Sequence, residues 1–148
     1  MTDSPRFTVR PADWAADEAA IAQVRRAVFI EEQCVSEALE WEEMAPNGTW
    51  FVAVDAKAGV IGIVHLAADG HIYRMAVLAP WRRHGVGAAL LAMALAEARR
   101  QGHTQVQLSA QTHATAFYAC YGFQAEGGVY QDAGIPHISM TLTFKDPA

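Results

Sequence analysis

Cysteine is scarce in this 148-residue chain, and long apolar runs are missing. Its two cysteines, Cys34 and Cys120, fit no metal-ligand spacing, and without a secretion signal we expect neither a disulfide nor a metal site. No apolar run is long enough to span a membrane, because Arg99 and Arg100 close the longest candidate. The first residues lack the charged and apolar regions of a signal peptide, so a cytoplasmic protein is expected.

Positive charge is also scarce. Lys and Arg number 11 against 16 Asp and Glu, and the resulting net charge of −5 argues against general nucleic-acid binding. An apolar content of 52% excludes a disordered chain. The chain shows no internal repeat, low-complexity tract or linker. We therefore expect residues 1–148 to form a single domain with its own core.

The most informative stretch that is present runs from Arg82 to Gly87 and reads Arg-Arg-His-Gly-Val-Gly. It lies between an apolar run typical of a strand, residues 72–78, and an alanine- and leucine-rich run typical of a helix, residues 86–100. Unpaired amides at a helix start, the helix dipole and glycines without a Cβ all favour a bound anion. With Arg74 adding charge nearby, the stretch favours a pyrophosphate. The alternative is an ordinary basic turn.

The remaining pattern predicts strands alternating with helices. Three consecutive central strands are apolar on both faces, which implies that helices cover both sides of a sheet. A strand, a helix and a further strand then imply a right-handed parallel crossover. The predicted strands cover residues 7–10, 49–55, 60–66, 72–78, 105–109 and 138–145. The predicted helices cover residues 13–30, 37–44, 86–100 and 115–121, with a turn at 46–48. The expected fold class is an α+β sandwich, with a mixed, mostly antiparallel sheet of six or seven strands flanked by helices.

The order of these parts resembles the GNAT superfamily of acyl-CoA-dependent N-acetyltransferases over nearly the whole chain. The family's pyrophosphate-binding signature is matched by Arg82, Gly85 and Gly87. Its second signature is matched by Phe117, Tyr118, Gly122 and Phe123. The segments around residues 26–33 and 132–140 are similar to the ElaA-like or YjcF-like branch. That branch gives little information on the substrate.

The resemblance implies a sheet splayed between its fourth and fifth strands, with acetyl-CoA as co-substrate in the gap and no metal. The pantetheine arm would pair with the fourth strand, and the pyrophosphate would lie on the amides of the basic turn. Arg82 would either support the turn or flank the phosphates, and a glutamine stands where the family often has an asparagine. The residues that the resemblance assigns to the co-substrate are Met75, Ala76, Val77, Arg82, Arg83, His84, Gly85, Val86, Gly87, Ala88, Gln111 and Phe117.

The implied reaction is direct transfer of an acetyl group from the thioester to a primary amine. The amide of Val77 would stabilise the negative charge that develops on the thioester oxygen. Tyr118 would protonate the leaving thiolate, since a phenol with a pKa of about 10 stays protonated at neutral pH. The alternative for Tyr118 is a packed aromatic. The family's usual strand glutamate is missing, and the open candidates for the base are Glu32, His65, His71, His137 and a chain of waters. The amine losing its proton before it binds is a further alternative.

The acceptor is expected to be a small-molecule or peptide amine. Glu31 and Glu32 follow the first predicted helix, where the acceptor enters in the family, and they would attract a cationic amine. His137, Trp41 and Trp50 are further candidates on this side, Trp50 with a core position as its alternative. Neither nucleic acid nor membrane is expected as a partner, and the fold permits a homodimer through the last strands.

Other functions remain as alternatives. A dinucleotide-binding enzyme is disfavoured, because Leu90 stands at the third glycine position and no acidic residue follows at the required distance. A P-loop is excluded, since the Gly-Lys-Ser/Thr ending is absent. A catalytically inactive acyl-CoA-binding sensor or partner module is allowed by the missing strand glutamate. An acyl-homoserine-lactone synthase is echoed only weakly, at residues 41–43.

Overall fold

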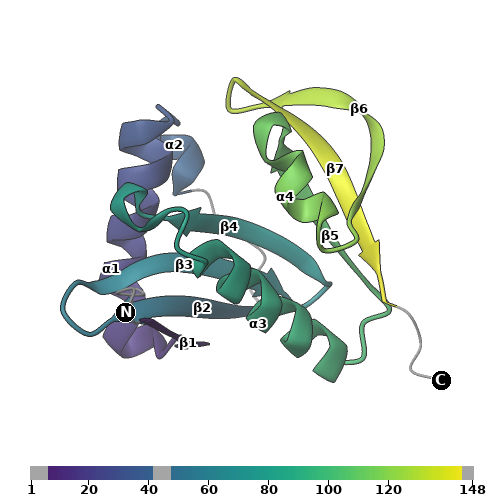
Figure 1. Cartoon of the computed structure of the whole chain (residues 1–148). Coiled ribbons are helices and arrows are strands. Elements are labelled where there is room, and N and C mark those ends of the chain that lie inside the picture. The colour runs from purple at the N-terminus through teal and green to yellow at the C-terminus, as the bar shows by residue number, and fades with distance from the viewer. Residues whose placement is uncertain (1–6, 42–47, 145–148) are drawn as a thin grey trace.

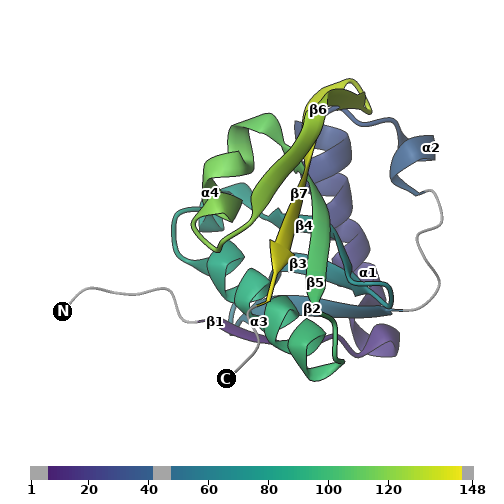
Figure 2. The same cartoon turned by 90° about the vertical axis from the view of Figure 1, so that its right-hand side faces the viewer.

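A computed structural model describes residues 7–41 and 48–144, and within them seven strands form one sheet in the order β1-β2-β3-β4-β5-β7-β6 (Figures 1 and 2). The strands are β1 (Phe7–Pro11), β2 (Gly48–Asp55), β3 (Gly59–Ala67), β4 (His71–Val77), β5 (Gln105–Gln111), β6 (Gln124–Asp132) and β7 (Ile135–Thr143). All neighbouring strands are antiparallel except β4 and β5, which are parallel. The predicted mixed, mostly antiparallel sheet is confirmed.

Helices cover both faces of the first four strands. The helices are α1 (Trp14–Arg25), its π-helical continuation η1 (Arg26–Glu32), α2 (Glu37–Glu40), α3 (Val86–Arg100) and α4 (Thr115–Ala119), with 3₁₀ turns η2 (Ala79–Trp81) and η3 (Thr112–Ala114). Helix α3 packs on one face of the sheet and α1 on the other (Figure 1). On β2, Phe51 enters the core under α3 while the next residue, Val52, enters the core under α1. This two-sided burial explains why the central strands are apolar throughout.

The sequence did not predict β6 as a strand. All nine of its residues are exposed, so it carries no apolar alternation that would reveal it. The helix predicted over residues 13–30 extends as α1 and η1 to Glu32, and the helix predicted from residue 37 ends at Glu40. Residues 42–47, which contain the rest of that predicted helix and most of the predicted turn, lie outside the described residues, as does Lys145.

The sheet opens between β4 and β5. These strands pair only at His71 with Gln107 and Ile72 with Leu108, and they diverge beyond that point (Figure 1). On its other side β4 carries a bulge, because two steps along β3 oppose three along β4 between its pairs with β3. Arg74, within the bulge, has a left-handed φ of 52°. The splay leaves the second half of β4 without a strand partner on the β5 side.

Helix α3 begins at the edge of this opening. The chain leaves β4 through η2 and a tight turn in which Arg83 and Gly85 have left-handed φ angles of 66° and 82°. Gly85 is the N-cap and contributes no side-chain cap, so the amides of the first helical turn point outward unpaired. The predicted helix over residues 86–100 is confirmed. In the part of the chain that is described, no helix combines the length and apolar character needed to cross a membrane.

Candidate functional site

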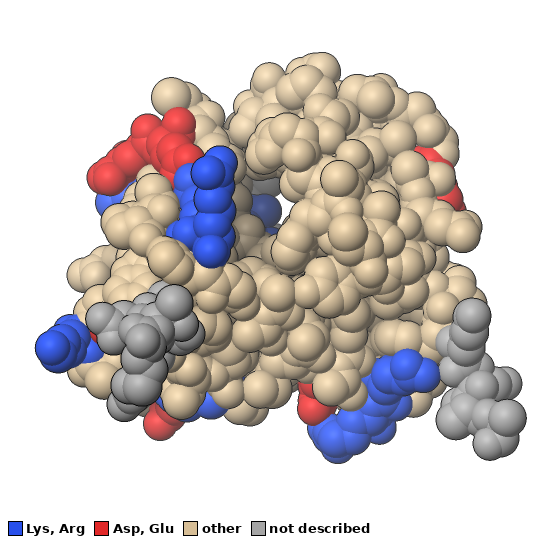
Figure 3. Space-filling model, viewed as in Figure 1, with Lys and Arg blue, Asp and Glu red and all other residues tan. Residues whose placement is uncertain are grey.

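A cleft of about 990 Å³ lies where β4 and β5 part. Its walls come from the end of η1, from β4, from the basic turn with the start of α3, from α4, and from the β6–β7 hairpin. Figure 3 shows a hollow between the two halves of the molecule, with basic atoms inside it and basic and acidic atoms together on its rim. The cleft therefore joins segments that are far apart in the sequence.

Most of the residues predicted for the site line this cleft. Those that do are Glu32, Met75, Ala76, Val77, Arg82, Arg83, Gly85, Val86, Gly87, Ala88, Gln111, Phe117, Tyr118 and His137. Those that do not are Glu31, His84, His65, His71, Trp41 and Trp50. Glu31 and His84 are exposed beside the cleft, whereas His65 is buried against the rings of Trp50 and Tyr73.

The basic turn presents backbone amides and positive charge to one end of the cleft. The amides of Val86, Gly87 and Ala88 belong to the first turn of α3, where the helix dipole adds partial positive charge. A Cβ on Gly87 would lie 3.7 Å from a ring carbon of Phe117 and 3.8 Å from a methyl carbon of Val77, which are ordinary contact distances. Packing therefore does not require a glycine there, and its small size leaves room on the cleft side.

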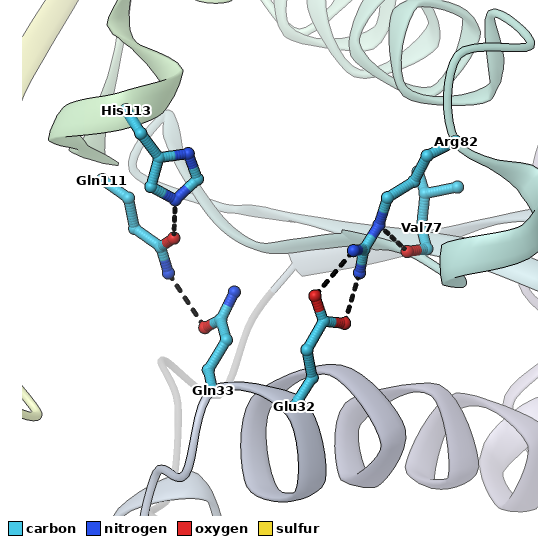
Figure 4. Close-up of polar contacts among 6 residues, drawn as sticks. All are labelled: Glu32, Gln33, Val77, Arg82, Gln111 and His113. Carbon is cyan, nitrogen blue, oxygen red and sulfur yellow. Dashed lines mark hydrogen bonds and ion pairs between the residues drawn. The ribbon is translucent and has the colours of Figure 1, made fainter.

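Arg82 links the basic turn to the end of η1 and to β4. Its Nη1 and Nη2 atoms donate to the two carboxylate oxygens of Glu32 at 2.6 Å each, and its Nε donates to the carbonyl of Val77 at 2.9 Å (Figure 4). The hydrogen bonds from Arg82 lower the pKa of the Glu32 carboxyl, and those to Glu32 raise the pKa of the guanidinium. Arg82 thus supports the turn. Glu32 remains an ionised carboxylate, and its negative charge is offset by the guanidinium of Arg82.

A second polar contact joins the end of η1 to the end of β5. Gln111 donates from Nε2 to the side-chain oxygen of Gln33 at 2.9 Å, and its own oxygen lies 2.7 Å from Nε2 of His113 (Figure 4). The end of η1 is therefore tied to both sides of the splay, to the turn through Glu32 and to β5 through Gln33. Sequence reasoning missed Gln33 and His113. No local signal marks the contact between Gln33 and Gln111, which are 78 positions apart, and His113 becomes part of the site only through Gln111.

Tyr118 reaches the cleft from α4. Its ring packs edge-on against Phe117 and Phe123, with centroids 5.1 Å and 5.8 Å away. Burial raises the pKa of its hydroxyl to about 12. Among the described residues the hydroxyl has no hydrogen-bond partner, so a proton on it is available to a ligand in the cleft.

The candidate bases are separated by the fold. His137 lies in the cleft wall, and its Nδ1 sits 2.7 Å from the carbonyl oxygen of Ile135. With Nδ1–H donating to that carbonyl, a neutral imidazole presents Nε2 as an acceptor. His65 lies outside the cleft, and burial, with the charges of Arg25 and Arg74, lowers its pKa to about 4. The structure brings His137 and Glu32 to the cleft and leaves His65 and His71 outside it.

Two further features concern charge and metals. Arg74 lines the cleft, although the sequence drew attention to it only as nearby charge. Asp132, at the end of β6, also lines it. Within residues 7–41 and 48–144, no group of three or more His, Cys, Asp or Glu side chains is arranged to hold a metal ion.

Comparison with known sequences gives a family and several relatives. The family described as "Acetyltransferase (GNAT) domain" matches residues 13–144. Two proteins of Bacillus subtilis are similar, the uncharacterized protein YyaT and the uncharacterized N-acetyltransferase YjcF. YyaT is 32% identical over 80% of this chain and 84% of its own length. YjcF is 32% identical over 79% of this chain and 86% of its own length.

Solved structures share the fold. A putative N-acetyltransferase from Lactobacillus plantarum has a TM-score of 0.82 at 25% identity, covering 93% of this chain and 97% of that one. Escherichia coli ElaA has a TM-score of 0.78 at 23% identity, covering 93% and 99%. A GNAT family acetyltransferase from Elizabethkingia anophelis, solved with acetyl-CoA bound, has a TM-score of 0.67 at 17% identity, covering 97% and 100%.

Proposed function

This chain belongs to the GNAT acetyltransferase family, and on that premise we propose that it is an N-acetyltransferase that moves an acetyl group from acetyl-CoA to a primary amine. The family and the ElaA-like or YjcF-like branch expected from the sequence are confirmed. The acetyl donor, the amine acceptor and the roles of individual residues are parts of the proposal.

One observation carries the donor side of the proposal. The unpaired half of β4, the free amides of α3 and the hydroxyl of Tyr118 all border one cleft. Leu78 donates to the carbonyl of Ile61, and because antiparallel ladder bonds alternate, the amide of Val77 faces away from β3 toward the open side. A pantetheine amide would pair with this strand, and the pyrophosphate would accept hydrogen bonds from residues 86–88. The Elizabethkingia protein, which shares this fold, holds acetyl-CoA.

The chemistry follows from the same groups. The neutral amine attacks the thioester carbonyl, a C–N bond forms, and the amide of Val77 stabilises the developing oxyanion. The C–S bond then breaks, and Tyr118 donates its proton to the leaving thiolate. His137 accepts the proton that the amine loses, directly or through a water, since its Nε2 is the free acceptor on the cleft wall. Tyr118 recovers its proton from solvent.

Titration calorimetry with acetyl-CoA tests this proposal, with NAD and ATP as control ligands. We expect selective binding of acetyl-CoA that is abolished by Gly87→Glu, because the new carboxylate occupies the phosphate position and repels it. Gly87→Ala is the matched control. Its Cβ makes only ordinary contacts, so this variant should fold and bind acetyl-CoA more strongly than the Glu variant does. Unchanged affinity in a folded Gly87→Glu protein would refute the phosphate site.

A further inference from the structure

One buried carboxylate is shared by two arginines next to the cleft. Oε2 of Glu40 lies 2.8 Å from Nε of Arg25 and 3.1 Å from Nε of Arg74. Arg25 also donates to the backbone carbonyl of Glu40. One negative charge therefore faces two positive charges, and the group carries an excess of one positive charge. Such an excess is costly inside a protein unless an anion completes it.

The two arginines differ in where they point. The side chain of Arg25 is 12% exposed and its guanidinium lies over the rings of Trp41 and Trp50. The side chain of Arg74 is 26% exposed, and Arg74 lines the cleft. Its bulge with a left-handed φ re-aims the side chain at this position of β4. Arg74 is thus the arginine of the pair that a ligand can reach.

Most of the hydrogen-bonding capacity of Arg74 is unused. A guanidinium carries five N–H donors. Among the described residues, the one ion pair of Arg74 is with Glu40, and its buried Nε atom has no hydrogen-bond partner. The lowered pKa of buried His65, caused first by burial and then by Arg25 and Arg74, reflects the same excess of positive charge.

Within residues 7–41 and 48–144, the other charges on this side of the cleft do not balance the excess positive charge. Glu32 is paired with Arg82, and Glu31 lies outside the cleft. Asp132 lines the cleft from the β6–β7 hairpin, and no ion pair joins it to Arg74 among the described residues. Apolar side chains of η1, Val28 and Phe29, complete the wall. This part of the cleft is basic and apolar.

We propose that Arg74 binds an anionic group on the acceptor, so that the acceptor is a primary amine carrying a carboxylate, such as an apolar α-amino acid. This inference rests on the proposed function. The fork of a guanidinium matches a carboxylate with two parallel hydrogen bonds, and the pair is stronger than one between neutral groups. The apolar wall from η1 receives the side chain of such an acceptor.

Matched acceptors that differ only in charge test the proposal. Acetyl transfer is measured for L-leucine against L-leucinamide and for L-phenylalanine against L-phenylalaninamide, at equal concentrations of the neutral amine. We expect the carboxylates to have a kcat/KM about tenfold to a hundredfold higher, as for loss of a charged hydrogen bond. Arg74→Gln should remove this preference and leave the affinity for acetyl-CoA unchanged, and Arg74→Lys should restore part of it.

Arg26→Gln is the matched control, because Arg26 is a neighbouring arginine paired with Glu37 and lies outside the cleft. It should keep the preference for carboxylates. Binding of N-acetyl-L-leucine and of its amide in the presence of CoA, followed by calorimetry, gives a readout that needs no turnover.

The outcomes separate the two proposals. Acetylation of amides as fast as carboxylates, or a preference that survives Arg74→Gln, overturns the anion site and leaves the acetyltransferase standing. A protein that binds N-acetyl-L-leucine through Arg74 but does not bind acetyl-CoA keeps the anion site and overturns the acetyltransferase. If Arg74→Gln fails to fold, a reduced preference in Arg74→Lys decides in favour, and full retention there decides against.

Discussion

The ring of Tyr118 packs edge-on against two aromatic rings at the cleft wall, and burial raises the pKa of its hydroxyl to about 12. We expect Tyr118→Phe to lower kcat by about 10²–10⁴-fold, the usual value of a positioned proton donor, with acetyl-CoA affinity unchanged. Because deprotonation removes the acid form, wild-type activity should lose nothing to this tyrosine until the pH nears its pKa of about 12. Steady-state rates as a function of pH and calorimetry measure both effects.

Two outcomes would contradict the catalytic role of Tyr118 or the enzymatic function of the protein. Unchanged turnover in a folded Tyr118→Phe protein would show that the tyrosine is a packed aromatic. Binding of acetyl-CoA by the wild type without transfer to any amine would instead indicate an acyl-CoA-binding module without catalysis.

His65 is a buried histidine whose pKa is lowered to about 4, mainly by burial. The folded protein holds it neutral, while in the unfolded chain the imidazole binds a proton with the ordinary histidine pKa of 6.5. The unfolded state therefore binds more protons between these values, and stability falls as the pH drops from about 6.5 to about 4. We expect a loss on the order of 3 kcal/mol over this window.

Urea unfolding of wild type and His65→Gln at several pH values between 7.5 and 4 measures this contribution. The carboxyls with lowered pKa values, such as Asp17 and Glu32, act in both proteins, so the difference between the two curves isolates the histidine. Parallel curves for the two proteins would contradict the assignment.

At the scale of elements, β4 contains a residue with a strained backbone that also lines the cleft. Arg74 adopts a left-handed φ of 52° inside a bulge, a conformation that costs a residue with a Cβ about 1 kcal/mol. Replacement by Gly and by Ala removes the same side-chain contacts, but only Gly relieves the strain. We expect Arg74→Gly to be more stable than Arg74→Ala by about 1 kcal/mol in urea unfolding. An alanine variant of equal or greater stability would show that the bulge relaxes in solution.

At the scale of the whole molecule, the splay divides the sheet into two parts that share two residue pairs between β4 and β5. A ligand in the cleft would join these parts through β4, α3 and α4. Binding to the folded state alone stabilises it by about 2.7 kcal/mol at a concentration a hundred times the Kd. We therefore expect acetyl-CoA to raise the unfolding midpoint.

Hydrogen exchange locates that effect. Acetyl-CoA should slow exchange of cleft amides in residues 75–77 and 86–88, and should leave the exchange of β1 and the adjoining edge of β2 nearly unchanged, since these lie away from the cleft. Protection confined to β1 and the adjoining edge of β2 would place the ligand elsewhere.

Local patterns in the sequence determined most of the elements and one end of the site. The helix over residues 86–100 has the predicted bounds, because its composition and the glycines around it act within a few residues. The basic turn was recognisable for the same reason. The exposed strand β6 was invisible, since a strand with no buried face has no apolar alternation.

Only the tertiary structure decided how the charged groups of the cleft are used. Glu32, expected from the sequence to attract an amine, is neutralised by Arg82, 50 residues away. Glu40 is shared with Arg74, and Gln33 meets Gln111. Such pairs depend on where the bulge and the splay send the backbone, and shifts in pKa depend on burial, which no short stretch of sequence specifies. The sequence by itself thus determined the family and the fold, and it predicted the phosphate-binding turn. Only the structure showed which side chains pair with Glu32, Glu40 and Gln33.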